Sequence, residues 1–563
     1  MIKRRNLWRV LLVLVAMYTI LTGCEKKEEN KETKKTVDQT ERASQMTLIN
    51  TENGIPEDDK YRTFYEVFVY SFCDSDGDRI GDLQGLTDKL NYLNDGNPET
   101  KSDLGVNGIW LMPIMPSETY HKYDVSDYMS VDSQYGTMED FDQFMEECQK
   151  RDIHVILDLV MNHTSSSHPW FTSACTYLQN LGVGTPDETE CPYFAYYNFS
   201  KEKKTEYYYE VPGTEWYYEA KFWSEMPDLN LNNQAVRDEF TNICQFWIDH
   251  GVSGFRLDAA KEFESDQTEK NVEILSWFED MVKGIDSEAY VVAEVWTDQN
   301  TYARYYESGI DSVFDFSFAN TDGVIASVLK KMGGYTASSY GKKVEAEEQL
   351  YSQYNPEYIN APFYTNHDMG RSAGYYAGDF SEAQTKMAGA LNLTMSGNCF
   401  LYYGEELGMK GSGEDENKRL GMLWEADKNA PGMCQGPPAA GSVKMKYGSL
   451  EEQQKDAGSI YEFYRNVIQL RNSIPAIARG KADYIEVLSD DNVCVIRKEY
   501  QGEEVLLLYN ISETEQQVNA TDWEDGSFSQ WKLSGVLTTD EQKIVYEEKN
   551  ILLPGYSVAV LTK

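Results

Sequence analysis

The chain has 563 residues, of which 41% are hydrophobic and 13% aromatic, and its formal net charge at pH 7 is −42. A chain of this length can bury a large core and is expected to form several domains. The negative charge argues against nucleic acid as a partner, because binding DNA or RNA requires a basic surface that displaces counterions. A neutral ligand fits this charge better.

The N-terminal segment joins a basic head to a short apolar run. Met1-Ile-Lys-Arg-Arg5 precedes the apolar residues 10–20, and Leu21-Thr-Gly-Cys24 follows them. The apolar run is too short to span a bilayer comfortably. The segment resembles a bacterial lipoprotein signal, which implies cleavage after residues 1–23 and lipid attachment to Cys24; a plain N-terminal anchor helix is the alternative. We therefore expect a protein anchored by lipid to the membrane at the bacterial cell surface, with no other membrane contact.

A polar segment and scattered cysteines follow. Residues 24–58 are rich in Lys, Glu, Thr and Asn and predict a flexible tether. The eight cysteines beyond Cys24 form no Cys-x-x-Cys pair, which favours buried free thiols over a zinc site or a disulfide framework. A bridge between Cys175 and Cys191 stays open.

Short β-branched and aromatic runs recur along the next 400 or so residues, with helical patterns in most of the gaps. Eight strands alternating with helices predict a (β/α)8 TIM barrel, over residues 59–163 and 229–473. The helical pattern over residues 138–151 places its apolar side chains on one stripe, as a core-facing helix requires. The eight runs are 64–72, 106–114, 154–160, 252–257, 290–295, 312–318, 358–364 and 399–403.

Two segments depart from this rhythm. Residues 164–228 are too long for one connection and are rich in Tyr, Pro and Gly, so they predict a domain inserted after the third strand. After a helical pattern over residues 460–471, alternating strands separated by Gly, Asn and Asp turns predict a C-terminal antiparallel β-sandwich over residues 474–563.

Polar motifs fall where four of the predicted strands end. They are Asp158 with Asn162-His163, Arg256 with Asp258, Glu294, and Asn366-His367-Asp368. Catalytic groups of a barrel lie at these strand ends. Any one carboxylate alone is more often a helix cap or an ion-pair partner, but several in order favour catalysis. Cleaving a bond between sugars needs such a set: one acid to protonate, one carboxylate to attack and polar groups to orient the substrate.

These motifs resemble the signature regions of the α-amylase family of glycoside hydrolases. The matching segments are Asp158-Leu-Val-Met-Asn-His163, Gly254-Phe-Arg-Leu-Asp-Ala-Ala-Lys261, Glu294-Val-Trp296 and Thr365-Asn-His-Asp368. Met226-Pro-Asp-Leu-Asn230 resembles the group intermediate between oligo-1,6-glucosidases and neopullulanases, which includes lipoprotein α-amylases. In Arg419-Leu-Gly-Met-Leu-Trp424, Gly421 stands where related enzymes have proline, so the shape of this loop stays open.

The resemblance implies a role for each matching residue. Asp258 is expected to be the nucleophile, Glu294 the acid/base and Asp368 a clamp on sugar hydroxyls in the transition state. Arg256 is expected to keep Asp258 ionised. A satisfied core or cap residue is the alternative for each His, and a solvated ion pair for Lys261. The expected substrate contacts are Tyr123, His121, Asp124, His163, Arg256, Lys261 and His367.

A second candidate site precedes the barrel motifs. Asp74, Asp76, Asp78, the Ile80 carbonyl and Asp82 place oxygens at alternate residues, a spacing that suits calcium. The loop is not an EF-hand, since Arg79 stands at its sixth position, where that loop needs Gly. It resembles the first-loop calcium site of many amylase relatives, so we expect Ca²⁺ here; an acidic Asx-turn is the alternative. A second calcium near Asn162 stays open.

Taken together, the motifs predict a retaining, endo-acting α-amylase that hydrolyses α-1,4 bonds of starch and maltooligosaccharides, as a monomer. The same machinery serves α-glucosidases, oligo-1,6-glucosidases and 4-α-glucanotransferases, which are the alternatives within the enzyme class. A non-catalytic starch-binding surface lipoprotein, or the sugar-binding lipoprotein of a transporter, is disfavoured because all three acids are present.

Overall fold

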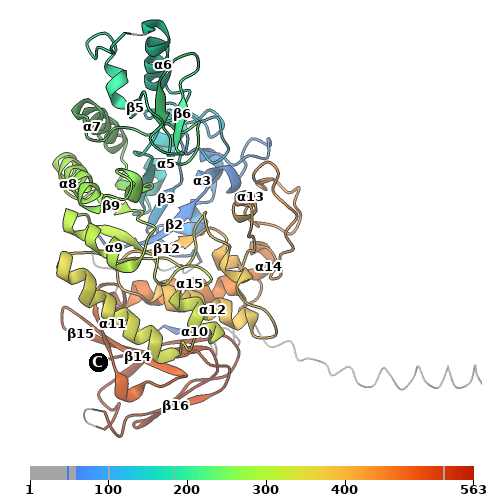
Figure 1. The fold of residues 1–563 in the computed structure, drawn as a ribbon. Coiled ribbons are helices and arrows are strands. Elements are labelled where there is room, and N and C mark those ends of the chain that lie inside the picture. The colour runs from blue at the N-terminus through green and yellow to red at the C-terminus, as the bar shows by residue number, and fades with distance from the viewer. Residues whose placement is uncertain (1–46, 50–58, 99, 101, 183, 524–525) are drawn as a thin grey trace, which may run out of the picture. The chain divides into compact units, whose positions relative to one another are not determined.

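Figure 1 shows the computed structural model of the chain, which describes residues 47–49, 59–98, 100, 102–182, 184–523 and 526–563. All of them belong to one compact unit, Ala43–Lys563. The predicted signal peptide, Cys24 and most of the tether lie outside the described residues, so these predictions stay predictions. Each helix in the described ranges is too short or too polar to cross a membrane.

A parallel sheet of eight strands in the described residues confirms the predicted barrel (Figure 1). The strand order is β11-β10-β9-β8-β4-β3-β2-β12, and a parallel bridge between Phe363 and Phe400 joins the two end strands. Seven of the eight predicted runs contain one of these strands, and the first run overlaps β2 from its second residue. Their bounds are β2 (Thr63–Val67), β3 (Gly108–Leu111), β4 (His154–Leu159), β8 (Gly254–Leu257), β9 (Tyr290–Ala293), β10 (Ser312–Asp315), β11 (Ala361–Pro362) and β12 (Cys399–Tyr402).

The barrel interior is filled by large side chains from alternate strand positions. Phe64, Trp110, Ile156 and Phe314 belong to one buried cluster, and Trp110 packs with Phe314 at a centroid distance of 5.4 Å. Because side chains two residues apart point to the same face of a strand, Glu66 and Asp158 also point inward, one level nearer the strand ends. The barrel interior is therefore apolar in the layer of Phe64 and Ile156. It is charged in the layer of Glu66 and Asp158, nearer the carboxyl ends of the strands.

The close packing of β8 against β9 requires a glycine. At Gly254 a Cβ atom would lie 1.9 Å from the carbonyl oxygen of Tyr290, and the φ angle is +150°. Only a residue without a side chain fits this conformation and this distance. Gly254 thus allows the strand that carries Arg256 to lie directly beside the strand that leads to Glu294.

Helices surround the barrel strands. Helix α5 (Met138–Gln149) confirms the predicted core-facing helix, and Thr137 and Asp140 form a capping box at its start. The remaining longer helices are α6 (Pro169–Leu181), α7 (Gln234–Asp249), α8 (Thr268–Ile285), α10 (Val324–Lys330), α11 (Ala337–Tyr354), α12 (Ser381–Leu393) and α15 (Ile460–Ser473). The shorter ones are α3 (Leu83–Asp88), α4 (Leu90–Leu93), α9 (Gln299–Ala303), α13 (Asp415–Lys418), α14 (Leu450–Gln453) and α16 (Pro475–Arg479).

The segment between β4 and α7 has secondary structure of its own. After α6 it forms a three-stranded antiparallel sheet of order β5-β7-β6, made of β5 (Phe199–Ser200), β6 (Tyr208–Glu210) and β7 (Tyr217–Glu219). A bridge between His163 and Asp228 joins its two ends. Figure 1 shows this segment beyond the end of the barrel near α5 and α7.

The C-terminal region is a pair of antiparallel sheets, as predicted. One sheet has the order β1-β17-β20-β15-β14-β13 and the other β16-β19-β18. Leu506, Leu508, Val518 and Ile551, which come from both sheets, share a core that includes Trp523. The strands are β13 (Lys481–Tyr484), β14 (Val493–Tyr500), β15 (Glu503–Asn510), β16 (Gln516–Asn519), β17 (Lys532–Thr538), β18 (Val545–Tyr546), β19 (Asn550–Leu553) and β20 (Ser557–Thr562).

Strand β1 (Thr47–Ile49) corrects one part of the tether prediction. It lies within the segment predicted to be flexible, yet it pairs antiparallel with β17. Thr-Leu-Ile is a short run with β propensity inside a polar stretch, and the edge of a sheet offers unpaired backbone groups that such a run can bond. The average composition of residues 24–58 concealed it.

Two buried basic side chains lie where the barrel meets the sandwich. Lys498 on β14 donates from Nζ to the carbonyl oxygens of Thr394 and Ile477, at 2.8 and 2.7 Å. Arg471 on α15 donates to the carbonyl oxygens of Leu393 and Met395, at 3.0 and 2.6 Å. Both side chains thus hold the connection that leads from α12 into β12.

All eight cysteines in the described part of the chain are free thiols, as predicted. Seven are buried and Cys175 is partly exposed. Cys175 and Cys191 do not form the bridge that the sequence left open.

Candidate active site

Arg256 lies at the centre of the polar layer at the carboxyl ends of the strands. Its Nη1 donates to Asp158 Oδ1 at 2.8 Å and to Asp258 Oδ1 at 2.7 Å, and its Nη2 lies 2.8 Å from Glu294 Oε2. Asp158 and Arg256 are register partners on β4 and β8. The Arg256 side chain is only 1% exposed. One guanidinium therefore joins three carboxylates from neighbouring strands.

The two predicted catalytic acids are buried but reach solvent. The Asp258 side chain is 12% exposed and that of Glu294 is 10% exposed. The residue after Asp258, Ala259, is left-handed with φ of 48°, and its amide donates to Glu294 Oε2 at 3.0 Å. The turn that follows Asp258 therefore holds the Glu294 carboxylate.

Burial governs the ionisation of Glu294. Burial raises the pKa of this carboxyl above its usual value, while the Arg256 charge opposes the rise and the Asp258 charge adds to it. The pKa of Asp158 is raised to about 7, again by burial and against the charge of Arg256. A raised pKa suits an acid that must arrive protonated.

Asp368 has the opposite electrostatic environment. His367 Nε2 lies 3.1 Å from its Oδ2, and Arg419 Nη2 donates to its Oδ1 at 2.8 Å. Although burial acts to raise the pKa of Asp368, the His367 and Arg419 charges hold it well below the usual range. With 31% of its side chain exposed, Asp368 is an ionised carboxylate open to a ligand.

Glu66 is a site residue that the sequence analysis missed. It lies on β2, is 1% exposed, and accepts from His367 Nδ1 at 2.6 Å. The two residues are 301 positions apart and meet only because the barrel closes. A charged residue inside the apolar run Phe64-Tyr-Glu-Val-Phe68 was the signal that could have identified it.

Two of the predicted substrate contacts lie beside these acids. The Tyr123 hydroxyl donates to Asp158 Oδ2 at 2.9 Å, and its ring stacks on His367 with centroids 5.5 Å apart. His163 Nε2 lies 3.2 Å from the Tyr123 carbonyl oxygen, and burial lowers the pKa of His163. The structure therefore brings Tyr123, His163 and His367 together.

His121, Asp124 and Lys261 have local partners. His121 Nδ1 lies 3.1 Å from Thr119 Oγ1, and burial together with the Arg419 charge lowers the pKa of His121 to about 4. Asp124 is buried and accepts from the hydroxyl groups of Ser117, at 2.6 Å, and of Thr119. These bonds make Asp124 a residue that shapes the turn.

Lys261, by contrast, is 34% exposed, and its Nζ lies 3.4 Å from Glu262 Oε1. This local ion pair is the alternative that the sequence analysis named. Lys261 still lies three residues beyond Asp258, in the turn that follows β8.

Exposed aromatic side chains accompany the acids. Trp296 follows Glu294 by two residues, is 47% exposed, and stacks on Phe316 with centroids 5.3 Å apart. Phe222 is 52% exposed, and its ring centroid lies 5.4 Å from that of His163. Trp223 beside it is 47% exposed. Exposed flat rings of this kind suit the faces of sugars.

The predicted calcium loop brings three of its acids together. The ligand oxygens of Asp74, Asp76 and Asp78 lie within 4.8 Å of one another. Among the described residues, none of the three has a Lys or Arg within ion-pair distance, and the Arg79 side chain instead donates to the Lys428 carbonyl oxygen at 2.9 Å. Backbone amides donate to all three carboxylates, as in an Asx-turn, with Gly77 N 2.7 Å from Asp74 Oδ1. The oxygen-rich cluster, which has no cationic side chain of the described residues beside it, also fits a hard divalent cation.

The other two predicted ligands of this loop have backbone contacts. Asp82 does not join the cluster: it caps α3, accepting from the amide of Gly85 at 2.7 Å and from the Ser75 hydroxyl at 2.8 Å. An N-cap and a metal ligand use the same side chain, so spacing alone could not separate them. The Ile80 amide donates to Asp78 Oδ1 at 2.7 Å.

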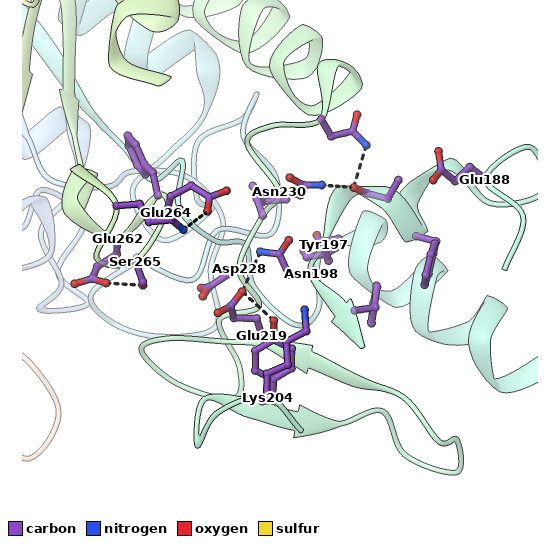
Figure 2. A pocket seen from close by; sticks show the side chains of 18 residues that line it. Glu188, Tyr197, Asn198, Lys204, Glu219, Asp228, Asn230, Glu262, Glu264 and Ser265 are labelled. Carbon is purple, nitrogen blue, oxygen red and sulfur yellow. Dashed lines mark hydrogen bonds between the residues drawn. The ribbon is translucent and has the colours of Figure 1, made fainter. Parts of the chain in front are cut away.

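A cavity of about 610 Å³ lies beside the turn that follows Asp258, and Figure 2 shows the side chains that line it. Its carboxylates include Glu219, Asp228 and Glu262. Asn162 Nδ2 donates to Asp228 Oδ1 at 3.2 Å, while Lys221 Nζ lies 3.4 Å from Glu262 Oε2. Lys221 thus supplies a positive charge near Asn162, where the sequence left a second calcium ion open.

Known proteins match this fold and these motifs over most of the chain. Residues 66–480 match the family described as alpha amylase, catalytic domain. The chain belongs to the α-amylase family. Its fold and this match make it a glycoside hydrolase.

Individual members of the α-amylase family are similar over most of their length. Alpha-amylase 3 of Dictyoglomus thermophilum is 36% identical over 463 residues, which cover 82% of this chain and 86% of that protein. The solved structure of Amy13B from Eubacterium rectale matches with a TM-score of 0.87 and 48% identity, covering 91% of this chain and 97% of that one.

Other relatives in the α-amylase family carry different names. Glucan 1,6-alpha-glucosidase of Streptococcus pneumoniae is 27% identical, covering 87% of this chain and 96% of that protein. 4-alpha-glucanotransferase of Thermotoga maritima is 28% identical, covering 80% of this chain and 95% of that protein. Membership of the α-amylase family therefore leaves the linkage and the acceptor to be decided.

Proposed function

We propose that this glycoside hydrolase is an endo-acting, retaining α-amylase that cleaves α-1,4 bonds of starch and maltooligosaccharides. The observation that carries the proposal is that Asp258 and Glu294 bind adjacent nitrogens of one guanidinium, Arg256. This shared partner keeps the two carboxyl groups close together. Retaining glycosidases hold theirs about 5–5.5 Å apart, whereas inverting enzymes leave room for a water between them.

The mechanism assigns one step to each acid. Glu294 gives its proton to the glycosidic oxygen while an Asp258 oxygen bonds to the anomeric carbon, which releases the leaving chain. A water then gives its proton to Glu294 as its oxygen displaces Asp258 from the sugar, and the configuration is retained. Asp368, ionised and open, binds sugar hydroxyls as positive charge develops on the ring.

Long glucan chains are the substrate that the surroundings of the acids favour. Trp296 lies on the Glu294 side and Phe222 on the His163 side, both about half exposed. Rings at separate places around the acids would contact different sugars of one chain. The name Alpha-amylase 3, carried by the Dictyoglomus relative, supports the same substrate class.

The test is product analysis on starch, maltoheptaose and pullulan. We expect early loss of iodine colour from starch and release of maltose and longer products, because an endo-acting enzyme cuts within chains. Glucose as the sole product would identify an α-glucosidase, cleavage at α-1,6 bonds an oligo-1,6-glucosidase, and chains longer than the starting maltoheptaose a glucanotransferase. The absence of any cleavage would favour a starch-binding protein.

We also propose a calcium ion at Asp74, Asp76 and Asp78, with the Ile80 carbonyl as a further ligand. A divalent ion would neutralise the three carboxylates and fix a loop in which Gly77 and Arg79 both have positive φ angles, +91° and 75°. The loop packs on a distant segment, since the amide of Asp74 donates to the Gly432 carbonyl oxygen at 3.2 Å.

Chelation should therefore lower thermal stability. A ligand present at one hundred times its dissociation constant stabilises the folded state by about 2.7 kcal/mol. We expect EDTA to lower the thermal unfolding midpoint by a few degrees, and added Ca²⁺ to restore it. The variant Asp76→Asn should lose most of this response, whereas Asp187→Asn, an exposed carboxylate in the insert, should keep it. An unchanged midpoint of the wild-type protein in EDTA would rule the site out.

A further inference from the structure

His367 lies between two carboxylates, one on each ring nitrogen. Nδ1 lies 2.6 Å from Glu66 Oε1, and Nε2 lies 3.1 Å from Asp368 Oδ2. A neutral imidazole has a single N–H group and can donate to only one of these oxygens. The other nitrogen would then present a lone pair to a carboxylate in a nearly dry interior, where such a contact is costly.

A third acceptor faces the same ring. The Tyr123 hydroxyl oxygen lies 2.8 Å from His367 Nε2. When its single hydrogen is donated to an ionised Asp158, its oxygen accepts from His367. Glu66 on one side, and Asp368 with Tyr123 on the other, therefore all require N–H groups from His367.

Asp158 adds a further negative charge near His367, whereas the two nearby arginines are cationic and do not replace these bonds. Arg419 donates from Nε to the His367 carbonyl oxygen at 3.2 Å and from Nη2 to Asp368. Arg256 contributes its charge through Asp158, to which Tyr123 is bonded. Charges thus alternate along Glu66, His367, Asp368 and Arg419.

The electrostatics agree with this geometry. Burial alone would lower the pKa of His367, but the Asp368 and Glu66 charges and hydrogen bonds raise it to about 10. Burial raises the pKa of the Glu66 carboxyl, and the His367 charge opposes that rise. The imidazolium–carboxylate pair is therefore the state that we assign across the neutral range.

We propose that Glu66 is a positioning residue that keeps His367 doubly protonated, so that His367 and Arg419 each bind one oxygen of an ionised Asp368. The inference rests on the proposed function, in which Asp368 binds the sugar. Glu66 touches no substrate and acts through His367. Two cations on the two oxygens fix both the charge and the rotation of the Asp368 carboxylate.

The direct test counts protons on His367. The chain has six histidines, so labelling with ¹⁵N-histidine and assigning by His367→Gln gives a resolvable set of ring nitrogens. In the wild-type protein we expect both His367 nitrogens to stay protonated from pH 6 to pH 9. In Glu66→Gln, which keeps the shape but removes the charge, His367 should titrate within this range, nearer its ordinary pKa of about 6.5.

The kinetic test uses the pH profile of the same variant. Losing a partner that orients a metal ligand typically costs about 10- to 100-fold in activity, and we take the same scale for a partner that orients Asp368. We expect Glu66→Gln to lose about this factor in kcat at pH 8, with KM changing less. At pH 5.5 the loss should be several-fold smaller, because His367 regains its proton there. A variant that is merely destabilised would not show this additional fall in kcat between pH 5.5 and pH 8.

Two further variants make the test decisive. Glu279→Gln removes another buried carboxylate, on α8, and should leave the pH profile unchanged. Glu66→Asp keeps the charge and should keep the wild-type dependence of kcat on pH above neutrality. This variant covers the case in which Glu66→Gln does not fold.

A neutral His367 in the wild-type protein at pH 7, or an unchanged pH profile in Glu66→Gln, would overturn the proposal. Failure of the proposed function has a different signature. The wild-type protein would then leave α-1,4-glucans intact, while the proton count on His367 could still be measured.

Discussion

Replacing Asp258 by Asn should abolish nearly all turnover while leaving the protein folded. An amide cannot attack the anomeric carbon, so no glycosyl-enzyme forms, and losses of about 10⁴- to 10⁶-fold in kcat are typical when a nucleophile of this kind is removed. The change keeps the size of the side chain and its contact with Arg256. The measurement is kcat on maltoheptaose, with circular dichroism to establish the fold.

The same variant should still bind its substrate. Asp368 and Arg419 are untouched, so we expect the dissociation constant for maltoheptaose to stay within about tenfold. Asp249→Asn, an exposed change on α7, serves as the control and should retain full activity. Turnover by Asp258→Asn at a rate near that of the wild type would show that another residue is the nucleophile.

Replacing Arg256 by Met should have the largest effect on stability. Removing one partner of a buried ion pair typically costs about 3–5 kcal/mol, because the other charge is left without compensation. Here three carboxylates, Asp158, Asp258 and Glu294, share the one guanidinium. Urea unfolding of the variant and of the wild type measures the cost, and we expect kcat to fall with it.

The loss of stability in Arg256→Met should be larger at high pH than at low pH. Without Arg256, the pKa values of Asp158 and Glu294 rise further above those of the unfolded chain. The folded state then binds more protons than the unfolded state, so stability decreases as pH rises through the range between the two sets of pKa values. The variant should therefore be less impaired at pH 5 than at pH 8.

A surface arginine provides the control for Arg256→Met. Arg304→Met removes an exposed ion pair with Glu269 and should cost no more than about 1 kcal/mol at either pH. An Arg256→Met protein as stable as the wild type at pH 8 would contradict the assignment of Arg256 as the counter-ion of the three acids.

The barrel could be read from the sequence because its strands are short apolar runs, four of which end in a polar motif. Asp158, Arg256 and Glu294 stand at such ends, so their convergence followed from the fold class. Glu66 could not be found in this way, since it lies inside an apolar run and contacts His367, which is 301 residues away in the sequence. Only closure of the sheet reveals that pair.

Other differences have local causes. Asp82 satisfied the calcium spacing and the helix-capping pattern equally, and the structure uses it as a cap. Asp124 was expected to contact the substrate, and two neighbouring hydroxyl groups donate to its Oδ1. Spacing identifies which residue types can act, whereas the partner of each oxygen depends on packing.

The buried side chains of Lys498 and Arg471 beside the start of β12 determine how far the catalytic and C-terminal parts of this enzyme can be separated. Lys498 belongs to the sandwich, yet the carbonyl oxygens to which it donates belong to the chain that enters the last barrel strand and to α16. Buried carbonyl groups need such donors. The sandwich therefore completes the hydrogen bonding of the barrel, so a minimal catalytic fragment would have to supply substitutes for Lys498 before its last strand could form as it does here.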